Sequence, residues 1–183
     1  MLKAKKGRLL ISEPSLNDNV FFKSVVLLTH HNDKESIGLI LNHPTKINLN
    51  EILNNIPLSD LPIYLGGPVE KQSLHFIHTL GSIIPNSKQI IDGIYFGGDF
   101  DIVIRLMHDK KITKNEIRFF VGYSGWEAEQ LNNEIRDDAW IVQTAKNELC
   151  MNYSTPKLWS DIIKTKKMEY AIWTNMPKDP NLN

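Results

Sequence analysis

Short apolar runs bounded by Gly, Pro, Asn or Asp dominate the first half of the chain and predict β-strands. The runs are GRLLIS (7–12), SVVLLTH (24–30), SIGLILN (36–42), LPIYLGG (61–67), SLHFIH (73–78) and QIIDGIYF (89–96). One segment differs, because the apolar residues of NLNEILNNI (48–56) recur at helical spacing and Asn48 followed by Glu51 has the pattern of a capping box. The first half is therefore expected to be β-rich with one short helix.

Helical and strand patterns are mixed in the second half. DIVIRLMHDKK (101–111) predicts a helix that Asp99 or Asp101 caps and that ends in two lysines, the charge favoured near a helix C-terminus. STPKLWSDIIKTKK (154–167) predicts another helix, with Pro156 in its first turn and one apolar stripe. Two segments between these helices predict strands, NEIRFFVGY (115–123) and DAWIVQ (138–143). Without a regular βαβ alternation, this mixture indicates an α+β fold rather than a doubly wound parallel sheet.

The chain of 183 residues has the size of one domain. It contains no internal repeat and no low-complexity linker, so residues 1–183 are expected to form a single compact domain. Residues 176–183, MPKDPNLN, contain two prolines and no periodicity, which predicts an extended tail on the surface.

Composition limits the classes of binding partner and the cellular location that we expect. Lys plus Arg and Asp plus Glu number 21 each, so the net charge of zero argues against an electrostatic nucleic-acid binder. The single Cys150 cannot form an internal disulfide and favours a reducing, cytoplasmic location. The apolar run at residues 9–11 is too short for a signal peptide, and no run approaches the ~20 apolar residues that span a membrane.

The segment GYSGW (122–126) is the strongest candidate for catalysis. Gly122 and Ser124 match the start of the Gly-x-Ser-x-Gly turn that presents the nucleophile of serine hydrolases, but Trp126 stands where the last glycine belongs. A structural alternative needs no chemistry: Ser124 as the N-cap of a helix, with Glu127 completing a capping box. Ser124 is thus either a nucleophile or a cap, and the capping pattern is the more complete of the two.

The histidine pairs do not predict a metal site. His75 and His78 are three residues apart in a strand-like run and so point to opposite faces, and the adjacent His30 and His31 also diverge. The glycine pair at 66–67 could present backbone N–H groups to an anion, but it lacks the spacing of a phosphate-binding loop. Neither a metal nor a cofactor is therefore expected.

Several motifs, taken in order, resemble the YqgE/AlgH family. They are GRLLIS, SVVLLTHH, IGLILNHPT, LGGPVEKQSLHFIH, FFVGYSGWEAEQLNNEI, DDAWIV and DPNLN, and they cover nearly the whole chain. The resemblance implies one α+β domain in which a mixed, bifurcated β-sheet partly closes into a small barrel surrounded by helices. It brings no established catalytic activity, and the family name refers to a proposed role in transcription of alginate genes. Two features depart from the usual family pattern: His43 replaces an arginine, and Glu127–Glu129 replace Gly-Pro-Gly.

The first hypothesis is a non-enzymatic regulatory module that binds a small ligand or a protein. Trp126 offers a flat apolar face, Gly125 leaves the backbone open beside it, and His43 lies in a turn next to a proline. The predicted cleft is lined by Asn42, His43, Gly66, Gly67, Gly125 and Trp126. Two alternatives remain, a transcriptional regulator that contacts DNA directly and a serine hydrolase that uses Ser124.

Overall fold

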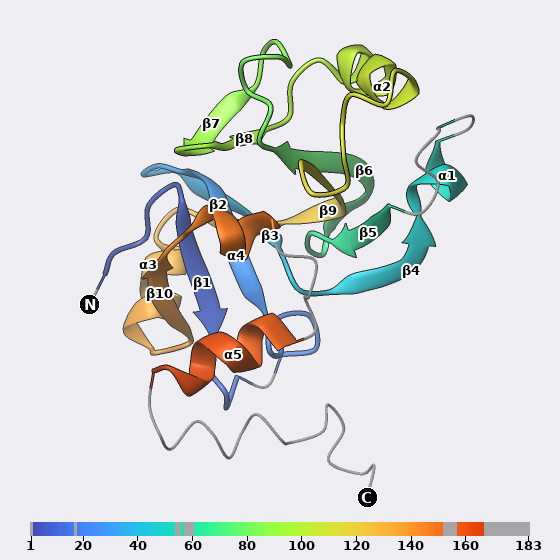
Figure 1. The fold of residues 1–183 in the computed structure, drawn as a ribbon. Helices are drawn as coiled ribbons and strands as arrows, with labels where there is room; N and C mark the ends of the chain where they lie inside the picture. The colour runs from blue at the N-terminus through green and yellow to red at the C-terminus, as the bar shows by residue number, and fades with distance from the viewer. Residues whose placement is uncertain (1, 17, 54–55, 57–60, 152–156, 167–183) are drawn as a thin grey trace, which may run out of the picture.

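The computed structural model describes residues 2–16, 18–53, 56, 61–151 and 157–166, which form one curled β-sheet with helices packed around it (Figure 1). The strands are β1 (Arg8–Ser12), β2 (Val25–His31), β3 (Glu35–Ile40), β4 (Pro44–Asn48), β5 (Pro62–Leu65), β6 (Val69–His78), β7 (Lys88–Ile91), β8 (Ile94–Phe96), β9 (Ile117–Glu127) and β10 (Trp140–Thr144). The helices are α1 (Leu49–Ile52), α2 (Phe100–His108), α3 (Gln130–Arg136), α4 (Asn147–Met151) and α5 (Leu158–Lys164).

The sheet forks at β9. Neighbouring strands follow the order β10-β1-β2-β3-β9-β6-β8-β7, and β5 joins β9 outside this path. The first half of β9 pairs in parallel with β5, where Ile63 lies opposite Phe119, while its second half pairs antiparallel with β3, where Ile37 lies opposite Gly125. β3 and β5 therefore share one edge of β9 and diverge from it, which confirms the bifurcated sheet.

The sheet also curls toward closure. Gly7, just before β1, lies so close to β7 that a Cβ added there would come within 2.5 Å of the Ile91 side chain. Lys6 donates a hydrogen bond to the Gln89 carbonyl of the same strand, 3.0 Å away. These contacts hold the residues before β1 against β7, the last strand in the order, so the sheet curls back on itself as expected for a partly closed barrel.

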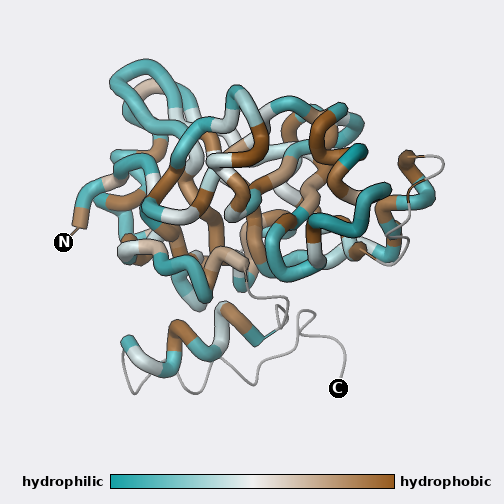
Figure 2. Tube along the Cα trace, turned by 45° about the horizontal axis from the view of Figure 1, so that its top comes forward, coloured by the Kyte–Doolittle hydropathy of each residue, from teal (hydrophilic) through white to brown (hydrophobic). Residues whose placement is uncertain are grey.

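Both faces of the central strands are covered, which explains their continuous apolar runs. In β1, Leu9 and Ile11 face the inner core, where α5 contributes Trp159. Leu10 faces the other way and packs in a cluster with Leu131 of α3. Figure 2 shows hydrophobic segments running through the inner strands and hydrophilic ones at the peripheral turns. The predicted apolar stripe of α5 is confirmed, because Leu158, Trp159, Ile162 and Ile163 are all buried.

A second core lies on the other branch of the fork, under α2. Val103 and Met107 of this helix are fully buried and share a cluster with Phe76 of β6 and Phe119 of β9. The prediction of an Asp99 cap is confirmed, since its side chain accepts hydrogen bonds from the backbone N–H groups that follow it. The helix ends at His108, before the predicted lysines, because Lys110 adopts a left-handed backbone conformation (φ 55°) that cannot continue it.

The first-half predictions hold closely. A strand occurs within each of the six predicted runs, with QIIDGIYF forming the hairpin β7–β8. The short helix α1 begins after Asn48, whose backbone N–H donates to Glu51 Oε1 at 2.8 Å, as the capping-box pattern predicts. The predicted positions of Pro156 and of the tail at 176–183 lie outside the described residues.

The prediction that Ser124 caps a helix is wrong. β9 continues through Ser124 to Glu127, and α3 begins only at Gln130. The reason is tertiary: residues 124–127 pair with β3, so their backbone groups bond to a neighbouring strand and not within a helical turn. A long-range sheet partner here overrides a local capping signal.

Candidate functional site

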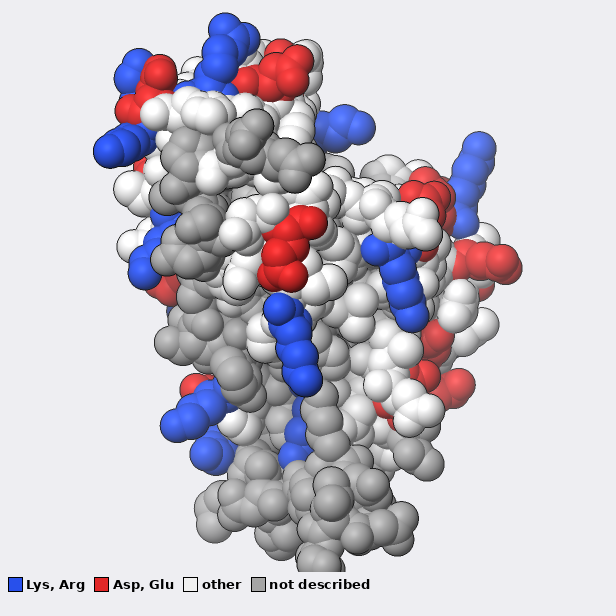
Figure 3. Space-filling view, turned by 90° about the vertical axis from the view of Figure 1, so that its right-hand side faces the viewer, with Lys and Arg blue, Asp and Glu red and all other residues white. Residues whose placement is uncertain are grey.

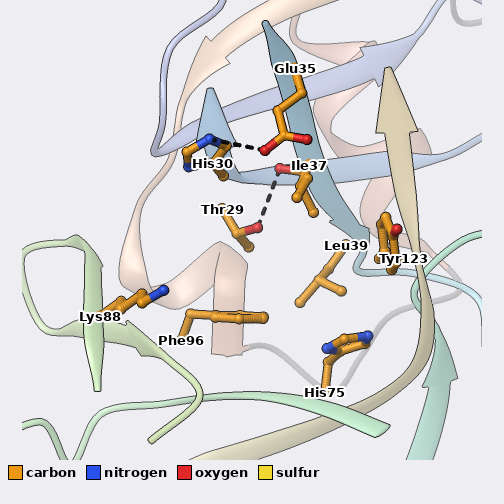
Figure 4. A pocket seen from close by; sticks show the side chains of 9 residues that line it. All are labelled: Thr29, His30, Glu35, Ile37, Leu39, His75, Lys88, Phe96 and Tyr123. Atoms are coloured by element: carbon orange, nitrogen blue, oxygen red, sulfur yellow. Dashed lines mark hydrogen bonds and ion pairs between the residues drawn. The ribbon is translucent and has the colours of Figure 1, made fainter. Parts of the chain in front are cut away.

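A cavity of about 430 Å³ lies beside the fork of the sheet, and we call it the fork cavity (Figure 4). Its lining comes from β2, β3, β6, β7, β8 and β9 and consists of Thr29, His30, Glu35, Ile37, Leu39, His75, Lys88, Phe96 and Tyr123. This volume falls in the range of small-molecule sites, which are typically apolar with a few convergent polar groups. The curl of the sheet creates the space, because β2 and β3 on one side of β9 face the strands β6, β8 and β7 on its other side.

Aromatic rings form one wall of the fork cavity. The His75 ring stacks on Phe96 with ring centroids 5.9 Å apart, and it meets Tyr123 edge-on at 5.8 Å. All three rings are partly exposed, while Leu39 is buried beneath them. The cavity therefore offers flat apolar surface to a ligand.

The hydrogen bonds of His75 favour one tautomer. The Ser73 hydroxyl lies 2.7 Å from the Glu70 carbonyl, which can only accept, and 2.9 Å from His75 Nε2. With the hydroxyl hydrogen donated to that carbonyl, His75 Nε2 is the donor in the second contact. The other ring nitrogen, Nδ1, carries a lone pair in the neutral ring. Burial lowers the pKa of His75, with Glu70 opposing the shift, so this neutral form is favoured at physiological pH.

Charged groups lie around the cavity rim. His30 Nε2 is 3.6 Å from Glu35 Oε1, a contact that is an ion pair only when His30 is protonated, and the same nitrogen lies 2.9 Å from the Asn32 amide nitrogen. Lys88 is exposed on β7, and its side chain reaches toward the cavity in Figure 4. Among the described residues no carboxylate lies within 4.0 Å of its ammonium group. Lys88 is thus a cation available to a ligand.

Gly125 and Trp126, two of the predicted cleft residues, line a neighbouring cavity of about 490 Å³. This cavity shares Glu35, Ile37 and Tyr123 with the fork cavity. The Trp126 side chain is only 4% exposed. Its indole N–H donates to Glu134, which also accepts from Trp140, each at 2.8 Å. Trp126 therefore serves mainly to hold α3 against the sheet.

Asn42 and His43 line a separate hollow of about 630 Å³. The Asn42 amide joins two backbone segments, accepting from the Val25 N–H at 2.8 Å and donating to the Lys23 carbonyl at 2.7 Å. His43 Nε2 lies 3.2 Å from the Ser24 hydroxyl. The structure thus places Asn42 and His43 in one hollow and Gly125 and Trp126 in another.

Gly66 and Gly67 lie at the fork itself. Both glycines are buried, and both pack directly on the backbone of β9. The Gly66 carbonyl accepts a hydrogen bond from the Ser124 hydroxyl at 3.0 Å. The absence of side chains here lets β5 and β9 approach closely, which is a structural reason for the glycine pair.

Ser124 is fully buried, with its hydroxyl committed to that carbonyl. A serine nucleophile must reach its substrate and pass its proton to a base. Within the described part of the chain, Ser124 has neither an exposed surface nor a hydrogen-bonded histidine.

A protein-family model described as AlgH-like matches residues 9–171. The chain belongs to the AlgH-like family. It is 39% identical to a UPF0301 protein of Bacteroides fragilis, over 97% of this chain and 91% of that protein. It is 36% identical to a UPF0301 protein of Chlorobaculum parvum, over 100% of this chain and 97% of the other.

Two solved structures share the fold of this AlgH-like chain. The solution structure of the AlgH protein from Pseudomonas aeruginosa matches with a TM-score of 0.73 at 24% identity, covering 98% of this chain and 100% of that one. The crystal structure of a protein from Corynebacterium diphtheriae matches with a TM-score of 0.76 at 20% identity, covering 96% and 94% of the two chains. The predicted family and the α+β half-barrel are both confirmed.

The described residues of this AlgH-like chain hold no group of three His, Cys, Asp or Glu side chains that could bind a metal ion. His78, a candidate from the sequence, is engaged elsewhere: its Nδ1 accepts from the Leu80 N–H and its Nε2 donates to the Gly97 carbonyl. Among the described residues, no helix is both long enough and apolar enough to cross a membrane.

Cys150 is expected to resist alkylation in the folded protein. Burial raises the pKa of this thiol to about 12, although the nearby Arg118 charge opposes the shift. Only the thiolate reacts readily, and the side chain is fully buried. Iodoacetamide at pH 8 should therefore label Cys150 in denaturant but leave it unmodified under native conditions, as intact-mass spectrometry would measure. Rapid labelling of the folded protein would contradict this prediction.

Proposed function

We propose that this AlgH-like protein is a non-enzymatic, cytoplasmic regulatory module that binds a small ligand in the fork cavity. The observation that carries the proposal is the cavity itself, in which a wall of partly exposed rings lies below a charged rim. Partly exposed aromatic side chains gathered in a concave surface are typical of binding sites. The neighbouring cavity with Gly125 and Trp126 continues this surface, so a longer ligand has room to extend along β3.

The chemistry of the lining favours binding over catalysis. The Thr29 hydroxyl donates to the Ile37 carbonyl and so has no base as its acceptor. The Ser73 hydroxyl lies 2.9 Å from His75 Nε2, but it donates its hydrogen to the Glu70 carbonyl at 2.7 Å, whereas a nucleophile must pass its proton to a base. The serine hydrolase alternative loses support for the separate reason that Ser124 is buried.

The net charge and the face drawn in Figure 3 give little support to direct DNA contact. Figure 3 shows Lys and Arg side chains interspersed with Asp and Glu over the face it presents. Strong binding to the DNA backbone requires clustered cations that displace counterions from the phosphates. With a net charge of zero, a regulatory role through a bound ligand or a protein partner is the simpler proposal.

The proposal predicts that a neutral apolar dye enters the fork cavity. N-phenyl-1-naphthylamine should gain fluorescence with the wild-type protein, because the ring wall excludes water from the dye. Ile37→Trp should weaken dye binding by about tenfold or more, since Ile37 lines the cavity from β3 and a larger side chain fills the space. Fluorescence titration measures both affinities.

Ile83→Trp is the matched control, because Ile83 is 51% exposed and outside the cavity lining. Circular dichroism would check that both variants fold. No dye binding to the wild-type protein, or equal binding to wild type and Ile37→Trp, would contradict the proposal.

A further inference from the structure

The polar groups of the fork cavity are distributed unevenly. One carboxylate, Glu35, faces His30 at the tip of the β2–β3 hairpin. One ammonium group, Lys88, approaches from β7, and in Figure 4 it lies across the cavity from Glu35, next to Phe96. The neutral His75 completes the lining below the rim, on β6. A ligand that enters therefore meets a different charge at each end.

We propose that the fork cavity selects a small aromatic carboxylate, with the ring against Phe96 and His75 and the carboxylate at Lys88. This inference rests on the proposed function, since it names the class of ligand for the same cavity.

The charges at the rim direct an anion to the Lys88 end of the cavity. Glu35 Oε1 lies 3.6 Å from His30 Nε2, a contact that is an ion pair only when His30 is protonated, so the carboxylate repels a ligand anion from its own end. Among the described residues, no carboxylate lies within 4.0 Å of the Lys88 ammonium group. A ligand anion would form a new charge-assisted hydrogen bond there, beside an apolar wall that weakens screening by water.

His75 sets the orientation of that anion. Its Nε2 proton is donated to Ser73, and its Nδ1 lone pair remains an acceptor in the neutral ring. A carboxylate oxygen next to this lone pair would be repelled, because both atoms are acceptors. The anionic group is thus directed away from His75 Nδ1 and toward the Lys88 end of the cavity.

The ring wall favours a flat ligand. His75 and Phe96 already stack at 5.9 Å, and Tyr123 stands perpendicular to them. A ligand ring can extend this arrangement by offset stacking or edge-to-face contact, each worth more than apolar burial alone. The cavity of about 430 Å³ has room for one or two fused rings.

The experiment compares 1-naphthoate with its neutral counterpart 1-naphthamide as competitors of N-phenyl-1-naphthylamine. Both have the same ring system, so a difference in affinity reports the charge. Wild-type protein should prefer naphthoate by about fivefold, as expected for a partly exposed charge-assisted hydrogen bond. Lys88→Gln should reduce that preference to less than about twofold.

Lys114→Gln is the matched control, because Lys114 is equally exposed and outside the cavity lining. It should keep the wild-type preference, which separates a local effect from a change in overall charge. Circular dichroism and unchanged dye binding would show that each variant is folded with an intact cavity.

The possible outcomes separate the assignment of the ligand class from the proposed binding function. Equal affinity for the two competitors, or a preference that persists in Lys88→Gln, would overturn the carboxylate assignment and leave the binding function intact. Failure of both competitors to displace a dye that does bind would overturn the aromatic class alone. Failure of the dye itself to bind would overturn the proposed function and this inference with it.

Discussion

Gly67→Ala is expected to lower the free energy of unfolding by roughly 3 kcal/mol or more, because alanine has no room at the fork. A Cβ at this position would come within 2.2 Å of the Tyr123 carbonyl group and 2.4 Å of the Ser124 nitrogen. These neighbours are backbone atoms of β9, so no side chain can rotate away to relieve the overlap. The two branches of the sheet would have to separate.

Gly125→Ala is the matched control for this substitution. A Cβ there would have its nearest neighbour at 3.4 Å, an ordinary contact with the Tyr123 ring. Its stability should stay within about 0.5 kcal/mol of wild type. Urea denaturation followed by tryptophan fluorescence measures both changes. Equal stability of the two variants would show that the close approach of β5 and β9 is not required.

Arg118→Ala is expected to destabilise the protein by about 4 kcal/mol. Arg118 lies on β9 and is fully buried. Its guanidinium group donates to the Cys150 carbonyl at 2.5 Å and to the Leu41 carbonyl at 2.6 Å, and it lies 4.3 Å from the centre of the Tyr64 ring. Truncation would leave both carbonyls without this donor and open a cavity in the core.

Arg118→Lys should recover only part of the loss, because one ammonium group cannot reproduce a planar fork that bonds two carbonyls and stacks on a ring. Arg105→Ala is the control, since Arg105 is exposed on α2 and its truncation should cost less than about 0.5 kcal/mol. Denaturation midpoints would measure the three variants. A loss below about 1 kcal/mol for Arg118→Ala would mean that the charge is not needed to join β9, the segment after β3 and α4.

The strands of the first half and the helices α1, α2 and α5 could be predicted because their signals are local. Alternating or continuous apolar runs between turn residues, and an acidic or amide cap before a periodic segment, depend on neighbours within a few positions. β4 has no such signal, since its five residues are almost all exposed and it is held by pairing with β5. The short α4 was missed as well, because its five residues are too few to show a helical period.

The candidate site was much less predictable. The sequence pointed to Trp126 and His43 because their residue types suit ligand binding, but they line different hollows. The residues of the fork cavity come from six strands, β2, β3 and β6 to β9, and nothing local connects Lys88 with His75 or Glu35. The alternation in SLHFIH did separate His75 from His78, and this was the one signal that could have placed His75 on an open face.

The sequence by itself determined most of the element types, the AlgH-like family and the equal numbers of basic and acidic residues that leave the chain without net charge. Tertiary structure alone decided three further points: that Ser124 lies buried in a strand, that the glycine pair is a packing contact, and that a cavity opens beside β9. The physical reason is that each depends on which distant strand pairs with β9. Hydrogen-bond partners across a sheet are chosen by the packing of the whole domain, whereas a cap or an apolar period is specified within one turn or one strand.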